Sequence, residues 1–114
     1  MLNQVIIVGR LVKKPIVEEN ENGRKVATIT LAVQRSYKNA DGIYDTDFIK
    51  CTLWNGIAEN TAEYCEKGDL VGVRGRLETS VYEKENGEKY RIISVVAEKV
   101  SFLSSSKTKK GEEK

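Results

Sequence analysis

Residues 47–54 alternate between two sets of side chains, which is typical of a β-strand with one face against a core. Ile49, Cys51 and Leu53 form the apolar set, and we assign them to the core face. The other face carries Phe48, Lys50, Thr52 and Trp54. A cation and a hydroxyl on that face predict contact with water. Two aromatics beside a lysine there suit the stacking of single-stranded nucleic acid. The alternative is that another layer of the protein or a second subunit covers this face and buries the two aromatics.

Four more segments have the composition and alternation of strands, namely residues 5–11, 25–34, 70–78 and 81–100. Asn-Gly pairs at residues 22–23 and 86–87 predict tight turns, and the second pair places the tip of a long C-terminal hairpin. Residues 39–42 predict a third turn.

The alternation also predicts which side chains of these strands lie in the core. On the second segment these are Ala27, Ile29, Leu31 and Val33. On the fourth segment Val71, Val73 and Leu77 share one face, and Arg74 and Arg76 share the other. Gly72 and Gly75 interrupt the fourth segment, and they predict a bend or bulge of the kind that a curled sheet needs.

One helix is expected just after the strand at residues 47–54. Small and apolar residues with helical spacing predict its buried side, namely Ile57, Ala58, Thr61, Ala62 and Cys65. Asn55 is the predicted N-cap and Gly68 the predicted C-terminal stop. Three strands, a helix and further strands predict an all-β protein. We expect a five-stranded oligonucleotide-binding (OB) barrel, with one short helix between the third and fourth strands and a long C-terminal hairpin.

The chain has 114 residues, enough for one domain, which we place at residues 1–103. Residues 104–114 are polar and aperiodic, and we expect a disordered tail. No apolar run has the length of a membrane span or the features of a secretory signal, so we expect a cytoplasmic protein. The net charge of +2 resides in that tail, so affinity for nucleic acid must depend on charge placement.

Residues with catalytic potential are scarce. The chain has no histidine and only two cysteines, Cys51 and Cys65, which we expect to be buried free thiols. It has no glycine-rich phosphate loop. Asp41, Asp45 and Asp47 could in principle hold Mg²⁺ for a nuclease or hydrolase, but a turn leading into a strand is the more ordinary setting for them. We therefore expect no enzyme activity, no metal and no cofactor.

Five segments resemble the bacterial single-stranded DNA-binding protein family in order and spacing: residues 1–11, 27–33, 47–51, 58–60 and 67–77. The resemblance covers about residues 1–103, and the last segment is the most specific. It implies an OB-fold homotetramer that binds single-stranded DNA without sequence preference. The expected role is protection of DNA during replication, recombination and repair, in the nucleoid.

The resemblance also implies the binding residues. The stacking aromatics correspond to Tyr37, Phe48, Trp54 and Tyr82. The phosphate-contacting cations correspond to Arg10, Arg35, Lys50, Arg74 and Arg76. Tyr82 could instead pack at a subunit contact, and the strand at residues 5–11 is expected to pair its edge with a second copy.

The C-terminal segment differs from the family pattern, which ends in a long tail with an acidic, aromatic-terminated tip. Residues 104–114 are short, mixed in charge and without an aromatic residue. Recruitment of replication or repair proteins through the tail is therefore doubtful. A truncation, a phage or mobile-element member or a specialised paralogue would each explain the difference. An RNA-binding or primosome-like accessory OB-fold module is the alternative function.

Overall fold

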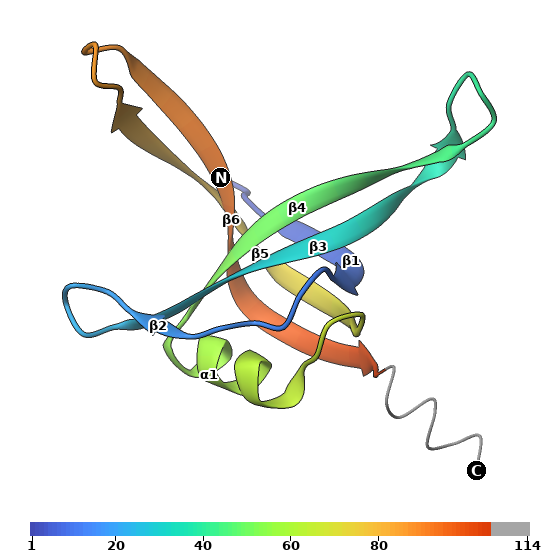
Figure 1. Ribbon diagram of the computed structural model, residues 1–114, viewed down its shortest axis with the longest axis horizontal. Helices are drawn as coiled ribbons and strands as arrows, with labels where there is room; N and C mark the ends of the chain where they lie inside the picture. The colour runs from blue at the N-terminus through green and yellow to red at the C-terminus, as the bar shows by residue number, and fades with distance from the viewer. Residues whose placement is uncertain (106–114) are drawn as a thin grey trace.

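The protein, described by a computed structural model over residues 1–105, has one sheet that curls into a barrel (Figure 1). Its elements are β1 (Val5–Leu11), β2 (Glu18–Glu19), β3 (Lys25–Lys38), β4 (Tyr44–Trp54), α1 (Asn55–Tyr64), β5 (Leu70–Glu83) and β6 (Lys89–Ser104). The strand order is β1-β5-β6-β4-β3-β2, and β1 also pairs with β3 at Arg10 and Leu11. That pairing closes five strands into a barrel, with the two-residue β2 outside it. The helix follows the third barrel strand, so the predicted OB fold is confirmed.

The core lies inside the barrel and beneath α1. Most of the predicted inward residues of β3 and β4 are buried, and Leu31, Cys51 and Leu53 have no exposed surface. Val33 and Ile49 are half-buried and pack against this core. Ala58 and Thr61 bring the buried side of α1 against this core, as the helical spacing predicts. Val71 and Val73 of β5 complete the wall. The period-two and period-3.6 patterns therefore identified the central core correctly.

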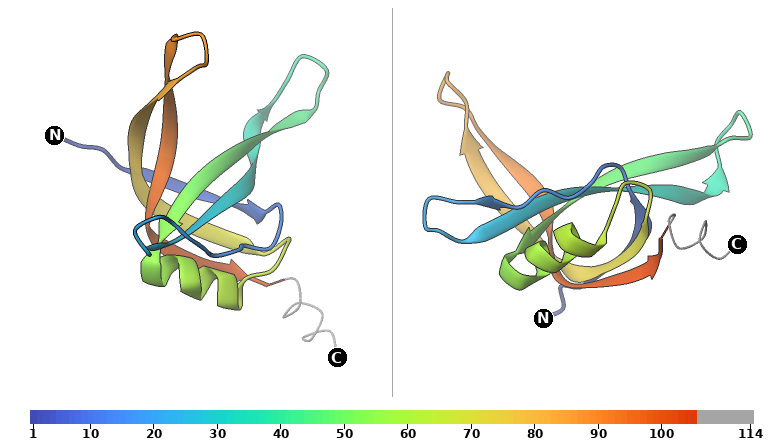
Figure 2. Two further views of the ribbon diagram at one scale, coloured as in Figure 1. Left: turned by 60° about the vertical axis from the view of Figure 1, so that its left-hand side comes forward. Right: turned by 60° about the horizontal axis from the view of Figure 1, so that its bottom comes forward.

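Two hairpins extend far beyond the barrel, and they diverge from each other (Figures 1 and 2). We call the end of the β3–β4 hairpin around residues 39–43 the first arm, and the end of the β5–β6 hairpin around residues 84–88 the second arm. Each arm ends in a tight turn, closed by Asn39 N donating to Ile43 O at 2.8 Å and by Lys84 N donating to Glu88 O at 2.7 Å. The predicted turns are therefore confirmed, but the strands are longer than expected.

The bulge predicted at Gly75 is present, with the extra residue on the partner strand. Arg74 pairs with Lys99 and Gly75 with Ala97, so Glu98 has no partner on β5. A Cβ at Gly75 would lie 2.0 Å from the Val96 carbonyl oxygen, well inside contact distance. Only a glycine therefore lets the two backbones approach closely enough for the sheet to bend here.

One expectation about strand β5 is wrong, and another needs a structural qualification. Residues 70–78 and the first part of the C-terminal hairpin form one continuous strand, β5, without a break. As expected, Leu77 falls on the same side of the strand as Val71 and Val73, but it is 44% exposed and lies two residues beyond Gly75, where the pairing of β5 with β1 ends. Alternation predicts the side of a strand, but it does not predict where the core ends.

The expected ends of the helix are also wrong. Asn55 does not cap the helix with its side chain: Trp54 occupies the N-cap position, and no side chain makes a capping hydrogen bond. Asn55 has a φ of 52°, a conformation that asparagine tolerates better than most residues. The helix ends at Tyr64 with Cys65 as its extended C-cap, so Gly68 lies in the following turn. The predicted tail, apart from Ser104 and Ser105, lies outside the described residues.

Candidate nucleic-acid interface

The outer face of the β3–β4 hairpin brings together three of the predicted residues. Phe48 pairs with Ala32, Lys50 with Thr30 and Trp54 with Val26, and directly opposed residues share a face. Phe48 is 66% exposed and Trp54 is half-buried. The strand partners are small or β-branched, so they leave Phe48 open to solvent. Among residues 1–105, no second layer of this chain covers the ring.

This face continues across β6 onto β5. Thr52 of β4 pairs in parallel with Val96 of β6, and Val96 pairs with Arg76 of β5. From Arg76 the regular register continues to Tyr82, which is therefore on the same face of the ribbon. The sheet thus joins the β4 residues to Arg76 and Tyr82. We call this continuous outer surface of β3, β4, β6 and β5 the binding face.

The remaining predicted aromatic on β3, Tyr37, lies near the end of the first arm and is 63% exposed. The β3–β4 register is irregular between Gln34 and Lys38, so alternation does not assign Tyr37 to a face. Because the arms diverge, Tyr37 and Tyr82 lie on separate projections from the barrel (Figure 2). A nucleic-acid strand that contacted both Tyr37 and Tyr82 would have to cross the barrel surface between the two arms.

Tyr82 has an aromatic neighbour that was not predicted as a site residue. The rings of Tyr82 and Tyr90 are stacked, with centroids 5.8 Å apart and an angle of 27° between their planes. Lys84 places its Nζ 5.6 Å from the Tyr90 ring. One face of Tyr82 is therefore already occupied, and a base could stack only on the other. The sequence places both tyrosines in the hairpin, but their pairing depends on the β5–β6 register.

Trp54 also has a partner that alternation could not identify. The Arg24 Cζ lies 4.5 Å from the centroid of the Trp54 ring, within the range of a cation–π interaction. Arg24 follows the turn before β3, and Trp54 ends β4. Only the register between these two strands brings them together.

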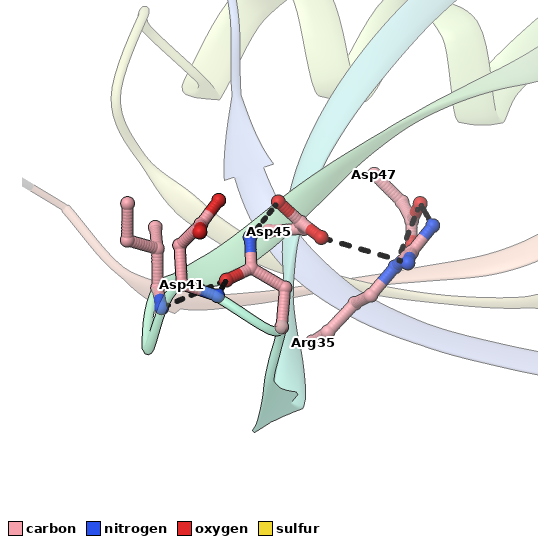
Figure 3. Close-up of polar contacts among 6 residues, drawn as sticks. Arg35, Asp41, Asp45 and Asp47 are labelled. Carbon is pink, nitrogen blue, oxygen red and sulfur yellow. Dashed lines mark hydrogen bonds and ion pairs between the residues drawn. The ribbon is translucent and has the colours of Figure 1, made fainter.

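Arg35, a predicted phosphate contact, is held by acidic residues (Figure 3). Its Nη2 and Nε donate to the Asp47 carboxylate at 2.9 and 3.1 Å, and its Nη1 lies 3.8 Å from Asp45 Oδ2. The hydrogen bond that Arg35 donates to Asp47 raises the pKa of Arg35, and the same bond lowers the pKa of Asp47 below its ordinary value of 3.8. Asp47 pairs with Val33, so this ion pair lies on the side of β4 opposite to Phe48.

The other predicted cations differ in their surroundings. Arg76 Nη1 pairs with Glu78 at 2.8 Å, and Arg10 Nη1 donates to the Gly68 carbonyl at 3.0 Å. Lys50 and Arg74 are exposed, and their side chains make no ion pair or hydrogen bond with other residues in the described part of the chain. Lys50 is thus the cation best placed beside Phe48 and Trp54 to meet a phosphate.

The aspartates near the first arm have structural roles. Asn39 Oδ1 accepts hydrogen bonds from the backbone N–H groups of Asp41 and Ile43, and Asn39 Nδ2 donates to Asp45 (Figure 3). Asp45 and Asp47 face Arg35. Within residues 1–105, no three His, Cys, Asp or Glu side chains are arranged to hold a metal ion.

Both cysteines are free and buried, as expected. Burial raises the pKa of the Cys51 thiol to about 11 and also raises the pKa of Cys65. Neither thiol is a ready nucleophile at neutral pH. In the part of the chain that the structure describes, no helix is long and apolar enough to cross a membrane.

Comparison with known proteins agrees with this architecture. A family profile described as "Single-strand binding protein family" matches residues 2–103. The chain is 50% identical over 103 residues to "Single-stranded DNA-binding protein B" of Bacillus subtilis (strain 168), covering 90% of this chain and 91% of that protein. It is 48% identical to "Single-stranded DNA-binding protein A" of the same strain, covering 90% of this chain.

The matched region does not extend over the full length of every relative. It covers 60% of protein A, and 61% of the "Single-stranded DNA-binding protein" of Bacillus cereus, which is 48% identical. The fold and the aromatic surface define an OB-fold protein with the features of a nucleic-acid-binding module. Within that class, the chain belongs to the single-strand binding protein family.

Proposed function

We propose that this protein binds single-stranded DNA without sequence preference and without chemical change to the DNA. The observation that carries the proposal is the outer face of β4, where Lys50 lies between Phe48 and Trp54 and its ammonium group pairs with no other residue of the range 1–105. Aromatic rings accept any base as a stacking partner, and a cation between them can meet a phosphate. The printed names of the relatives agree with DNA as the ligand.

Protection of single strands during replication, recombination and repair follows as the proposed cellular role. The protein would act in the cytoplasm, at the nucleoid. Bases would stack on Tyr37, Phe48, Trp54 and Tyr82. The proposed phosphate contacts are Arg10, Arg35, Lys50, Arg74 and Arg76. For Arg35, binding would require exchange of its Asp47 contact for phosphate, so its contribution is expected to be smaller than that of Lys50.

A homotetramer is the proposed assembly, and strand β1 supports the pairing of two copies within it. β1 pairs with β5 from Val5 to Arg10 but with β3 only at Arg10 and Leu11, which leaves much of one edge open in the described structure. Ile6 is 71% and Val8 48% exposed on this strand. An open edge with exposed apolar side chains favours pairing with a second copy. Sedimentation equilibrium should give about four times the 12.8 kDa of one chain; a monomer mass would exclude the assembly.

The test of the proposed function is a titration of labelled oligomers of the same length, one of deoxythymidine, one of mixed DNA sequence and one of uridine. We expect similar affinity for the two DNA oligomers and weaker binding to RNA. Preference for the RNA oligomer would favour an RNA-binding module instead. Absence of binding to all three would overturn the proposal.

A further inference from the structure

Arg24 is an exposed cation whose guanidinium lies over the indole of Trp54, with the Cζ 4.5 Å from the ring centroid. Cation–π contact of this kind is strongest with tryptophan among the aromatic side chains. The only tryptophan of the chain therefore has an arginine fixed against it before any ligand binds.

The backbone of Arg24 is held in place by the turn that precedes β3. Its N–H donates to the Asn20 side-chain oxygen at 2.8 Å, and its carbonyl accepts from the Asn20 N–H at 2.9 Å. Two residues further, Val26 pairs directly with Trp54. Arg24 is thus the diagonal neighbour of Trp54 on the same face, a separation that long side chains bridge. The contact therefore follows from the register of β3 and β4.

The charge of Arg24 is available for a ligand. Within residues 1–105, its side chain makes no ion pair and no hydrogen bond, in contrast to Arg35 and Arg76, which face carboxylates. A guanidinium that stacks through its flat face keeps its N–H donors free along its edge. Arg24 also lies at the end of the row formed by Phe48, Lys50 and Trp54, so it extends the alternation of rings and cations by one position.

We propose that Arg24 and Trp54 act as one binding unit, in which Arg24 orients the indole and pairs with a phosphate of the nucleotide that stacks on it. The inference rests on the proposed function and adds a residue and a role to it. The opposite possibility is that the guanidinium blocks a ring face that a base needs. In that case removal of Arg24 would strengthen binding.

The experiment compares wild-type protein with Arg24→Ala, Arg24→Lys and the control Arg91→Ala. Arg91 is exposed and pairs with Val81, on the side of the β5–β6 ribbon opposite to Tyr82. Anisotropy of a labelled deoxythymidine oligomer gives the affinity over a series of salt concentrations. Trp54 emission of each free protein reports on the cation over the ring.

Arg24→Ala should weaken binding several-fold at low salt and reduce the slope of log K against log salt by about 0.7, the value for one phosphate on a single strand. It should also shift Trp54 emission in the free protein. Arg24→Lys should retain most of the slope with weaker binding, since it keeps the charge but loses the planar contact. Arg91→Ala should leave affinity, slope and emission unchanged.

Wild-type affinity and slope in Arg24→Ala would overturn the inference, as would tighter binding. Equal losses in Arg24→Ala and Arg91→Ala would also overturn it, because they would mean that only total charge matters. If the wild-type protein itself does not bind the oligomer, the proposed function fails instead, so the two failures are distinguishable.

Discussion

Thr52 of β4 and Val96 of β6 are partners in a parallel pairing, and this contact joins the outer faces of the two long hairpins. Through it the surface of Phe48 and Trp54 continues to Arg76 and Tyr82. Within residues 1–105, the other backbone pair between β4 and β6 is Cys51 with Val95, which faces the core. A short parallel contact therefore positions two arms that each extend well beyond the barrel.

Truncation of Phe48 should weaken DNA binding without affecting folding. Phe48 is 66% exposed, so Phe48→Ala removes a stacking ring but little packing. We expect a loss of about 1–3 kcal/mol in binding to a deoxythymidine oligomer. Tyr64 on α1 is 65% exposed and provides the control: Tyr64→Ala should bind like the wild type. Anisotropy titrations measure the affinity of the two variants, and thermal melts measure their stability. An affinity of Phe48→Ala equal to that of the wild type would remove Phe48 from the site.

Neutralisation of Lys50 should reduce the salt dependence of binding. Lys50 is unpaired in the described structure and lies between two rings, so Lys50→Gln should remove about one phosphate contact. The slope of log K against log salt should fall in magnitude by about 0.7. Lys67, exposed in the turn after α1, is the matched control. A slope equal to that of the wild type would place the phosphate path elsewhere.

Asp47 should titrate at a lower pH than an ordinary aspartate. The Arg35 hydrogen bond lowers its pKa in the folded protein, so the pair stabilises the fold above the unfolded pKa, about 3.9. That contribution is lost as the pH falls through the folded pKa. NMR titration of the carboxyl carbon should show the low value in wild type and the ordinary value in Arg35→Ala. An ordinary value in both proteins would mean that the ion pair does not persist in solution.

A side chain at Gly75 should destabilise the barrel. Its Cβ would lie 2.0 Å from the Val96 carbonyl oxygen, and both atoms belong to paired strands with little freedom to move. Gly75→Ala should lower the free energy of unfolding by about 1–3 kcal/mol, or more if the bulge is lost. Gly72→Ala is the control, because the nearest atom to its Cβ would be the Leu103 Cδ1 at 3.5 Å, an ordinary van der Waals distance. Denaturant unfolding compares the stability of the two variants. Equal unfolding midpoints for Gly75→Ala and Gly72→Ala would contradict the proposed role of the bulge.

The sequence predicts the local features of this fold well, because they depend on neighbouring residues. Alternation placed Leu31, Cys51 and Leu53 in the core and Phe48 on the outside, and each is found there. Asn-Gly pairs marked two of the hairpin turns. The predicted N-cap at Asn55 failed because the chain leaves β4 directly into α1, with Trp54 still extended at the junction.

Contacts that depend on the pairing register between strands could not be predicted from the sequence. The contacts of Tyr82 with Tyr90 and of Trp54 with Arg24 arise between strands, and a shift of the pairing would remove them. The exposure of Leu77 depends on how far the barrel extends along β5, which no local pattern encodes. The resemblance to a family suggested Arg35 as a phosphate contact, but it did not reveal the carboxylates that face this side chain.

The most direct measurement is the intrinsic fluorescence of Trp54 during titration with poly-deoxythymidine at low and high salt. Trp54 is the only tryptophan, so the emission reports on one predicted stacking position. We expect strong quenching at low salt, saturation at a fixed number of nucleotides per oligomer, and weaker binding at high salt. Unchanged emission in a complex that forms by anisotropy would contradict stacking on Trp54 and would move the binding face away from β4.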